Sequence, residues 1–121
     1  MGNRKIMVID DESIIGEMFK INFGNEHYDV ETFTNAEPAI ARLREEQFDL
    51  VITDLKMKGI DGMEVLKIIK SEMPKTKVIM ITAFANLNAA VEAFRGKVDD
   101  FFPKPAKIKD LKARVAKLLG D

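Results

Sequence analysis

Three aspartates, one threonine and one lysine occupy equivalent places in the sequence, because each stands at or just after the end of a short apolar segment. They are Asp10, Asp11, Asp54, Thr82 and Lys104. Three carboxylates brought together would repel one another, so a cation is expected among them. Mg²⁺ prefers hard oxygen ligands, keeps several of its waters and binds phosphate well. The residue types therefore indicate a magnesium site that handles a phosphoryl group.

These residues also supply the chemistry of phosphoryl transfer. An aspartate can attack phosphorus and form an acyl phosphate, and the transfer depends on in-line positioning and on positive charge over the equatorial oxygens. Mg²⁺ and the Lys104 ammonium would provide that charge, and the Thr82 hydroxyl a hydrogen bond. Each residue alone has an ordinary explanation: Asp54 as a helix cap or solvated loop acid, Thr82 as a strand terminator, Lys104 as a solvated charge. Their joint occurrence at successive segment ends favours the functional interpretation.

The segments that precede these residues are typical of buried strands. Short runs of branched apolar residues bounded by turn residues indicate strands that are covered on both faces. One further segment alternates apolar and polar residues, as an edge strand does. The expected strands span residues 5–9, 29–33, 50–53, 77–82 and 100–103.

Apolar residues at helical spacing predict a helix after each strand. The expected helices span about residues 13–25, 35–46, 62–73, 86–95 and 108–118. In the first helix the residues at that spacing are Ile14, Ile15, Met18, Phe19 and Ile21. Asn35 is expected to cap the second helix.

Five alternations of strand and helix with short connections predict a doubly wound α/β fold of the flavodoxin-like (βα)5 type. In that fold five parallel strands have the order 2-1-3-4-5, helices cover both faces, and ligands bind beyond the carboxyl ends of strands one and three. Asp10 and Asp11 would then lie beside Asp54, with Thr82 and Lys104 on the neighbouring strand ends. The fold therefore predicts one shared site.

Composition limits the class of protein. Nineteen basic and twenty acidic residues give a net charge of −1, so no overall field attracts nucleic acid or an anionic membrane. The chain has no cysteine, which excludes disulfides and thiolate metal sites. No apolar segment has the length of a membrane span or the core of a signal peptide. We therefore expect one soluble cytoplasmic domain, residues 1–121, that binds neither nucleic acid nor membrane directly.

The same motifs resemble the receiver domains of bacterial two-component response regulators. The resemblance spans the whole chain and rests on Asp10-Asp11, Asp54, Thr82-Ala83 and Lys104-Pro105. It implies that Asp54 is the phospho-acceptor and that a sensor histidine kinase or a phosphotransfer protein is the donor. It also implies a cis peptide bond between Lys104 and Pro105, a state found mainly before proline.

The resemblance further implies how the metal is held. Asp11 and Asp54 would bind Mg²⁺ directly, Asp10 would act largely through water, and the Lys56 backbone carbonyl would be the remaining protein ligand. The metal would be the required cofactor for modification of Asp54.

A switch is also implied by the resemblance. Thr82 and Lys104 would hold the phosphoryl oxygens, and Phe101 occupies the position of the family's switch aromatic. Movement of Thr82 and Phe101 would change a face that spans about residues 86 to 118. A downstream effector or a second copy of the chain would then bind that face.

Several positions depart from the usual pattern of these receivers. Lys58 stands where a proline is common, and Lys97-Val98 replaces a small Gly-Ala pair. Phe101 lacks the hydroxyl of a tyrosine, so switching would rest on ring packing. Lys56 and Phe84 occupy positions that tune the lifetime of the acyl phosphate. These departures concern lifetime and switch amplitude rather than the chemistry.

Two other classes of protein compete with this interpretation. A phosphohydrolase of the haloacid dehalogenase type also forms an aspartyl phosphate, but it needs a second acid two residues after the nucleophile, where this chain has Lys56. The chain also lacks an inserted cap to enclose a substrate, so an enzyme is not expected. A receiver-like interaction module without phosphorylation would be favoured by loss of an acid, of Thr82 or of Lys104, and all are present.

Overall fold

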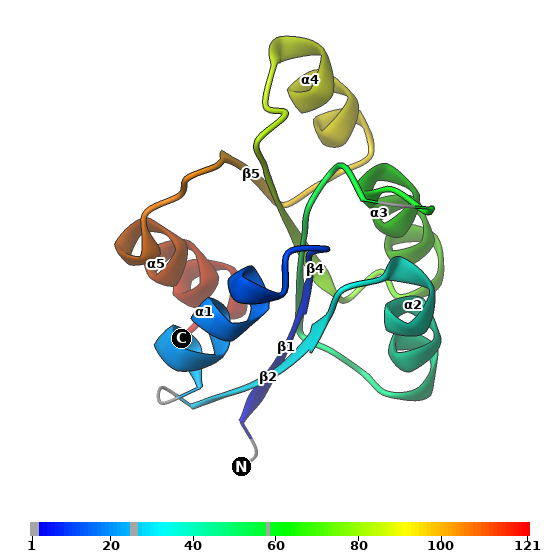
Figure 1. Ribbon diagram of the computed structural model, residues 1–121. Helices are drawn as coiled ribbons and strands as arrows, with labels where there is room; N and C mark the ends of the chain where they lie inside the picture. The colour runs from blue at the N-terminus through cyan, green and yellow to red at the C-terminus, as the bar shows by residue number, and fades with distance from the viewer. Residues whose placement is uncertain (1–2, 25–26, 58) are drawn as a thin grey trace.

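The computed structural model describes residues 3–24, 27–57 and 59–121, so Asn25, the expected end of the first helix, and the atypical Lys58 lie outside the described residues. The described residues form a five-stranded parallel sheet in the order β2-β1-β3-β4-β5 (Figure 1). The strands are β1 (Arg4–Ile9), β2 (Tyr28–Phe33), β3 (Leu50–Thr53), β4 (Lys77–Thr82) and β5 (Asp100–Pro103). The predicted strand order is confirmed, and β2 is an edge strand.

A helix follows each strand, which makes the fold doubly wound. The helices are α1 (Ser13–Phe23), α2 (Ala36–Glu45), α3 (Gly62–Glu72), α4 (Leu87–Arg95) and α5 (Ile108–Leu119). Helices α1 and α5 cover one face of the sheet and α2 and α3 cover the other, whereas α4 stands apart at one end (Figure 1). None of the described helices is long and apolar enough to cross a membrane.

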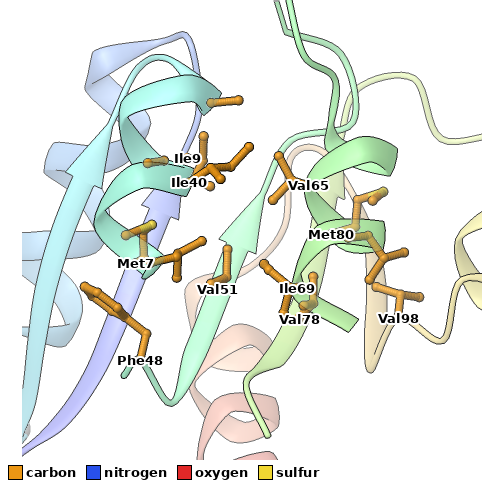
Figure 2. Close-up of a cluster of buried hydrophobic side chains, with 14 of the residues drawn as sticks. Met7, Ile9, Ile40, Phe48, Val51, Val65, Ile69, Val78, Met80 and Val98 are labelled. Atoms are coloured by element: carbon orange, nitrogen blue, oxygen red, sulfur yellow. The ribbon is translucent and has the colours of Figure 1, made fainter. Parts of the chain in front are cut away.

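The sheet is buried on both faces, so each central strand contributes side chains to two hydrophobic cores, one on each face. Alternate side chains of a strand point to opposite faces, and in β1 Met7 and Ile9 join one core whereas Ile6 and Val8 join the other. The first core lies under α2 and α3 (Figure 2). The continuous apolar runs in the sequence reflect this double burial.

Helix α1 forms where the apolar spacing predicts it, but not all of those apolar residues face the sheet. Ile14 and Ile21 are 64% and 71% exposed, although they share the helical spacing of their apolar neighbours. The helix packs on the sheet through Gly16, Phe19 and Phe23 instead. A Cβ on Gly16 would lie 2.9 Å from a side-chain carbon of Thr32, so glycine lets α1 approach β2 closely. Ile14 and Ile21 are seven residues apart and therefore lie together on the opposite side.

Two asparagines expected at helix starts behave differently. Asn35 precedes α2 with extended backbone, but its side chain makes no capping hydrogen bond. Asn86 precedes α4, and its side-chain oxygen accepts a hydrogen bond of 2.8 Å from the Ala89 backbone N–H. The cap expected at Asn35 therefore lacks its side-chain hydrogen bond, whereas Asn86, expected only as the first residue of its helix, makes one.

Backbone hydrogen bonds extend the sheet one residue past the strands and so fix the site residues at one edge. Asp54 donates its N–H to the Ile9 carbonyl at 3.0 Å, and Lys104 donates its N–H to the Thr82 carbonyl at 2.9 Å. Asp10 likewise donates its N–H to a carbonyl at the end of β2, at 3.0 Å. Residues from four strands thereby meet at the carboxyl edge, as the fold predicts.

Candidate functional site

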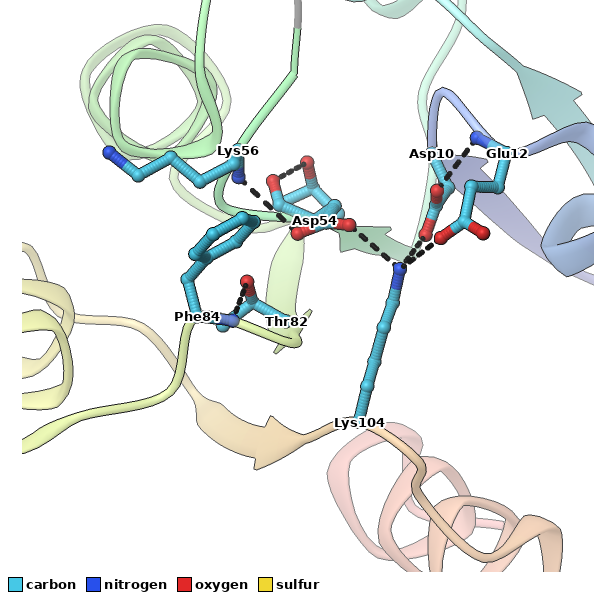
Figure 3. A network of polar contacts seen from close by, with 8 residues as sticks. Asp10, Glu12, Asp54, Lys56, Thr82, Phe84 and Lys104 are labelled. Carbon is cyan, nitrogen blue, oxygen red and sulfur yellow. Dashed lines mark hydrogen bonds and ion pairs between the residues drawn. The ribbon is translucent and has the colours of Figure 1, made fainter.

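The Lys104 ammonium lies at the centre of the carboxyl edge (Figure 3). Its Nζ donates to Asp54 Oδ2 at 2.7 Å and to Asp10 Oδ2 at 2.8 Å. A third, weaker contact joins Nζ to Glu12 Oε1 at 3.3 Å. Asp10 and Asp54 are only 5% and 6% exposed, so one cation bridges two buried carboxylates from neighbouring strands. The peptide bond between Lys104 and Pro105 is cis, as the resemblance implies.

The second oxygen of each buried carboxylate accepts a hydrogen bond from the backbone two residues onward. Asp10 Oδ1 accepts from the Glu12 N–H at 2.9 Å. Asp54 Oδ1 accepts from the Lys56 N–H at 3.3 Å. Both carboxylates are thus held at two points, which fixes their orientation.

Asp11 differs from the other two aspartates. It is exposed, and it has no hydrogen-bond or ion-pair partner among the described residues. One carboxylate oxygen from each of Asp10, Asp11 and Asp54 lies within 4.8 Å of the others. Only oxygen ligands are present in this cluster, and a free carboxylate beside two bound ones leaves coordination capacity for a hard cation. The three residues therefore fit a Mg²⁺ ion.

Burial and charge act against each other in this cluster. Burial raises the pKa of the Asp10 carboxyl above its ordinary value, and the hydrogen bonds from Lys104 and from the Glu12 backbone offset only part of that rise. Burial by itself would lower the pKa of the Lys104 ammonium, but its hydrogen bonds to Asp10 and Asp54 outweigh burial and raise that pKa. Lys104 therefore stays charged at neutral pH and partly offsets the carboxylate repulsion.

Thr82 ends β4 at the same edge, fully buried, and its hydroxyl links the site to α4. Thr82 Oγ1 accepts a hydrogen bond of 3.0 Å from the Phe84 backbone N–H, in the turn that leads into α4 (Figure 3). Because the oxygen acts as acceptor, the hydroxyl proton is available to a further acceptor. Movement of Thr82 would therefore break a contact that holds the turn before α4.

An open pocket of about 390 Å³ lies beside Asp54. Its lining residues are Asp11, Glu12, Asp54, Lys56, Met57, Ala83, Phe84 and Lys104. Lys56 and the exposed Phe84 ring therefore border the space next to Asp54. Phe101 lies elsewhere, partly buried against the core under α2 and α3.

Two positions that serve the site were not predicted from the sequence. Glu12 contacts Lys104 and adds a fourth acid. Three aspartates with Lys104 and Mg²⁺ would have a formal charge of zero, and Glu12 makes that charge −1. Gly62 faces the Asp54 backbone, where any Cβ would clash with the Asp54 carbonyl oxygen. Glu12 could have been found from the sequence, because it is an acid only two residues after Asp10. Nothing in the sequence marks the close approach of Gly62 to the Asp54 backbone.

Comparison with known proteins identifies relatives of the chain. Residues 6–116 match the family model for the response regulator receiver domain. The response regulator protein PilR of Pseudomonas aeruginosa is 33% identical over 98% of this chain and 27% of its own length. The transcriptional regulatory protein ResD of Bacillus subtilis is 36% identical over 95% of this chain and 48% of its own length. The chain thus spans about a quarter to a half of these curated relatives.

Solved structures show the same fold. A CheY-like response regulator receiver domain protein from Methanospirillum hungatei superposes with a TM-score of 0.94 at 28% identity, covering 98% of this chain and 95% of that one. The BeF3-activated DrrB receiver domain has a TM-score of 0.91 at 28% identity, covering 98% and 99% of the two chains. Both matches therefore extend over nearly the whole chain rather than over the sheet alone.

Proposed function

The chain belongs to the response regulator receiver domain family, and we propose that it receives a phosphoryl group on Asp54 from a sensor histidine kinase or a phosphotransfer protein. The observation that carries this proposal is the Lys104 ammonium bonded to both buried carboxylates, at 2.7 Å from Asp54 and 2.8 Å from Asp10. A lysine so placed holds the acceptor in position and remains next to any phosphoryl group bound there.

Mg²⁺ is the cofactor that fits the site. Asp10, Asp11 and Asp54 would hold it, with the Lys56 backbone carbonyl as the further ligand that the family pattern suggests. When bound, the metal supplies positive charge to the phosphoryl oxygens. Weak binding is expected, because Mg²⁺ gives up its waters reluctantly and gains few carboxylates here.

The chain's own residues then perform the transfer. An Asp54 carboxylate oxygen forms a bond to phosphorus as the bond from phosphorus to the donor nitrogen breaks, and the donor imidazole leaves. Lys104 and the Thr82 hydroxyl donate to the phosphoryl oxygens. Lys56 and Phe84 border the pocket over Asp54 and set the access of water, and thus the lifetime of the acyl phosphate.

The output is a conformational switch. Acyl phosphate formation adds about one negative charge, and Thr82 moves towards the new oxygens. Its hydrogen bond to the Phe84 N–H then breaks, which frees the turn before α4. Phe101 fills the vacated space, and the face spanning about residues 86 to 118 changes. A downstream effector or a second copy of the chain binds that face.

We also propose that residues 1–121 act as one receiver domain in the cytoplasm and as a regulator rather than as an enzyme with a separate substrate. The relatives are named as regulators. The position two residues after Asp54, where a phosphohydrolase of the haloacid dehalogenase type has its acid, is Lys56. Because the net charge is only −1, direct binding of nucleic acid or an anionic membrane is not expected of this domain.

Phosphorylation tests the proposal directly. Acetyl phosphate with Mg²⁺ should give one hydroxylamine-labile phosphoryl adduct by mass spectrometry, and Asp54→Asn should abolish it. Asp61→Asn serves as the control, because Asp61 caps α3 outside the cluster. An Asp54→Asn protein that retains the full adduct would show that another residue is the acceptor.

The switch has a separate test. Addition of beryllofluoride with Mg²⁺ should shift the amide NMR signals of the Asp10, Asp54 and Lys104 loops and also those of residues 86–102. Shifts confined to the three loops, with residues 86–102 silent, would contradict the switch while leaving phosphoryl acceptance intact.

A further inference from the structure

Glu12 is an acid of the site that is neither the acceptor nor one of the three carboxylates that fit a metal ion. It directly precedes α1, where a side chain commonly accepts a hydrogen bond from the first turn of the helix. The Glu12 side chain makes no such bond. Its Oε1 instead accepts from Lys104 Nζ at 3.3 Å (Figure 3). Glu12 is therefore turned towards the site rather than towards its own helix.

The backbone of Glu12 is held in place, which gives the carboxylate a defined position. Its N–H donates to Asp10 Oδ1 at 2.9 Å, and its carbonyl accepts from the Ile15 N–H at 3.0 Å. The side chain is 62% exposed and lines the open pocket beside Asp54, whereas Asp54 itself is buried. A phosphodonor that enters this pocket to reach Asp54 must therefore come close to the Glu12 carboxylate.

The charges that line this pocket leave it net negative. Its acids are Asp11, Glu12 and Asp54, and its cations are Lys56 and Lys104. The Lys56 ammonium points away from the carboxylates (Figure 3). Lys104 is already bonded to Asp54, and Glu12 takes part of its remaining hydrogen-bonding capacity. Glu12 thus adds negative charge and also competes for the cation that faces an incoming phosphoryl group.

We propose that Glu12 determines which class of phosphodonor the site prefers, by disfavouring acyl phosphates and favouring donors whose phosphoryl group is carried on a protonated nitrogen compound. This inference rests on the proposed acceptance of a phosphoryl group by Asp54 and names the substrate class of that site. A repulsive element of this kind is a common source of specificity, because it penalises the wrong ligand.

The two classes of donor differ in charge before and after transfer. In both, a bond forms from an Asp54 oxygen to phosphorus as the bond to the leaving group breaks. An acyl phosphate brings a phosphate dianion and releases a carboxylate anion. A protonated amine or imidazole that carries the same group has one negative charge less and leaves as a neutral base, so no proton has to be moved. The Glu12 carboxylate therefore repels the first class more strongly.

Two small donors test this preference. They are acetyl phosphate, which is a dianion, and phosphoramidate, whose nitrogen is protonated at neutral pH. With Mg²⁺ present throughout, Glu12→Gln should raise the rate of Asp54 labelling about tenfold with acetyl phosphate and about threefold with phosphoramidate, because the removed charge repels the dianion more. The ratio of the phosphoramidate rate to the acetyl phosphate rate should thus fall about threefold.

Salt and a neighbouring acid provide the controls. Added salt should lower the ratio of the parent towards that of Glu12→Gln, because screening weakens the repulsion. Glu12→Asp keeps the charge and should keep most of the preference. Glu17→Gln removes an exposed acid of α1 that does not line the pocket, and should leave the ratio unchanged. A purely structural role of Glu12 would instead change both rates by the same factor.

A further measurement needs neither metal nor donor. In resting protein, the NMR signal of the Lys104 side-chain nitrogen should shift in Glu12→Gln and stay in place in Glu17→Gln, and thermal unfolding checks that both variants are folded. An unshifted Lys104 signal, or an unchanged ratio in Glu12→Gln with normal labelling of Asp54, would overturn the role of Glu12 and leave the proposed function standing. Absence of Asp54 labelling with either donor in every protein would overturn the proposed function, and this inference with it.

Discussion

The acceptor site and helix α4 are joined by only a short turn, residues 83–86, yet they are built in opposite ways. The site buries charge, since Asp10 and Asp54 are enclosed and are each held by Lys104 and by a backbone N–H. Helix α4 exposes apolar surface and buries one alanine. One region therefore places polar groups inside, and the other places large apolar groups outside.

This difference matches what the proposed function requires of each region. Phosphoryl transfer needs reacting groups fixed within a fraction of an ångström, and two-point hydrogen bonding provides that. An element that changes during signalling is drawn from the least stable part of a fold, and a helix with little buried surface fits that role. The Thr82–Phe84 hydrogen bond, at 3.0 Å, is the connection between them.

The largest effect is expected on the rate of phosphorylation, from substitution of Asp11, the aspartate of the cluster that has no hydrogen-bond partner among the described residues. Asp11→Ala should lower the rate of labelling by acetyl phosphate at least about a hundredfold, because a direct metal ligand is worth several kcal/mol in the transition state. The unfolding free energy of the Asp11→Ala variant should differ from that of the parent by less than about 0.5 kcal/mol, since Asp11 is exposed and unpaired among the described residues. Unchanged labelling would rule out the role of Asp11 in metal binding. In urea unfolding without metal, the unfolding free energy of this variant should be slightly higher than that of the parent, because carboxylate repulsion is relieved.

Loss of the central cation should cost the most stability. Lys104→Met leaves Asp10 and Asp54 buried without their partner, and should destabilise the fold by roughly 3 kcal/mol at neutral pH. Glu12→Gln is the control, and its exposed contact should cost less than about 0.5 kcal/mol. Urea denaturation measures both variants. If the two variants lost equal amounts of unfolding free energy, burial would not set the strength of the Lys104 contacts.

The pH dependence of the Lys104→Met variant gives a second check. Burial raises the pKa of the Asp10 carboxyl in the folded state, and the variant removes the Lys104 hydrogen bond that partly offsets this rise. The folded state then binds more protons than the unfolded state, so stability increases as the pH falls through the raised pKa. The difference in unfolding free energy between variant and parent should therefore narrow on acidification. A constant difference would contradict the assignment of a buried ionised carboxylate.

A smaller effect compares two helix starts. Asn86→Ala removes a capping hydrogen bond of 2.8 Å from α4 and should destabilise the protein by about 1 kcal/mol. Asn35→Ala, at a start with no such bond, should cost distinctly less. Because α4 is weakly packed, hydrogen exchange of its amides should rise in the first variant more than that of α2. Equal protection of the two helices would contradict the view of α4 as locally unstable.

The smallest expected effect lies at the end of α4. Lys97 has φ of +68°, a left-handed conformation that L-residues with a side chain adopt at a cost. Lys97→Gly should therefore stabilise the protein by about 0.5 kcal/mol, because the greater freedom of glycine in the unfolded chain offsets part of the relief. Lys97→Ala should give no gain. Urea denaturation distinguishes the two. If both variants were more stable than the parent, the gain would come from loss of the lysine charge rather than from relief of backbone strain.

The strands, the helices and the chemical character of the acceptor site follow from the amino-acid sequence. Runs of apolar residues at strand length, followed by helical spacing, leave a doubly wound parallel sheet as the natural arrangement. Strand ends in such a sheet share one edge. The topology that the sequence predicts is therefore enough to place Asp10, Asp54, Thr82 and Lys104 together.

The contacts between side chains do not follow from the sequence in this way, and folding in three dimensions sets them. Packing turns Ile14 and Ile21 outward, leaves Asn35 without a capping bond, brings Glu12 to Lys104 and sets Gly62 against the Asp54 carbonyl. The physical reason is that periodicity fixes which residues share a face of an element. The direction of that face, and the distance to the next element, depend on packing between residues far apart in the chain.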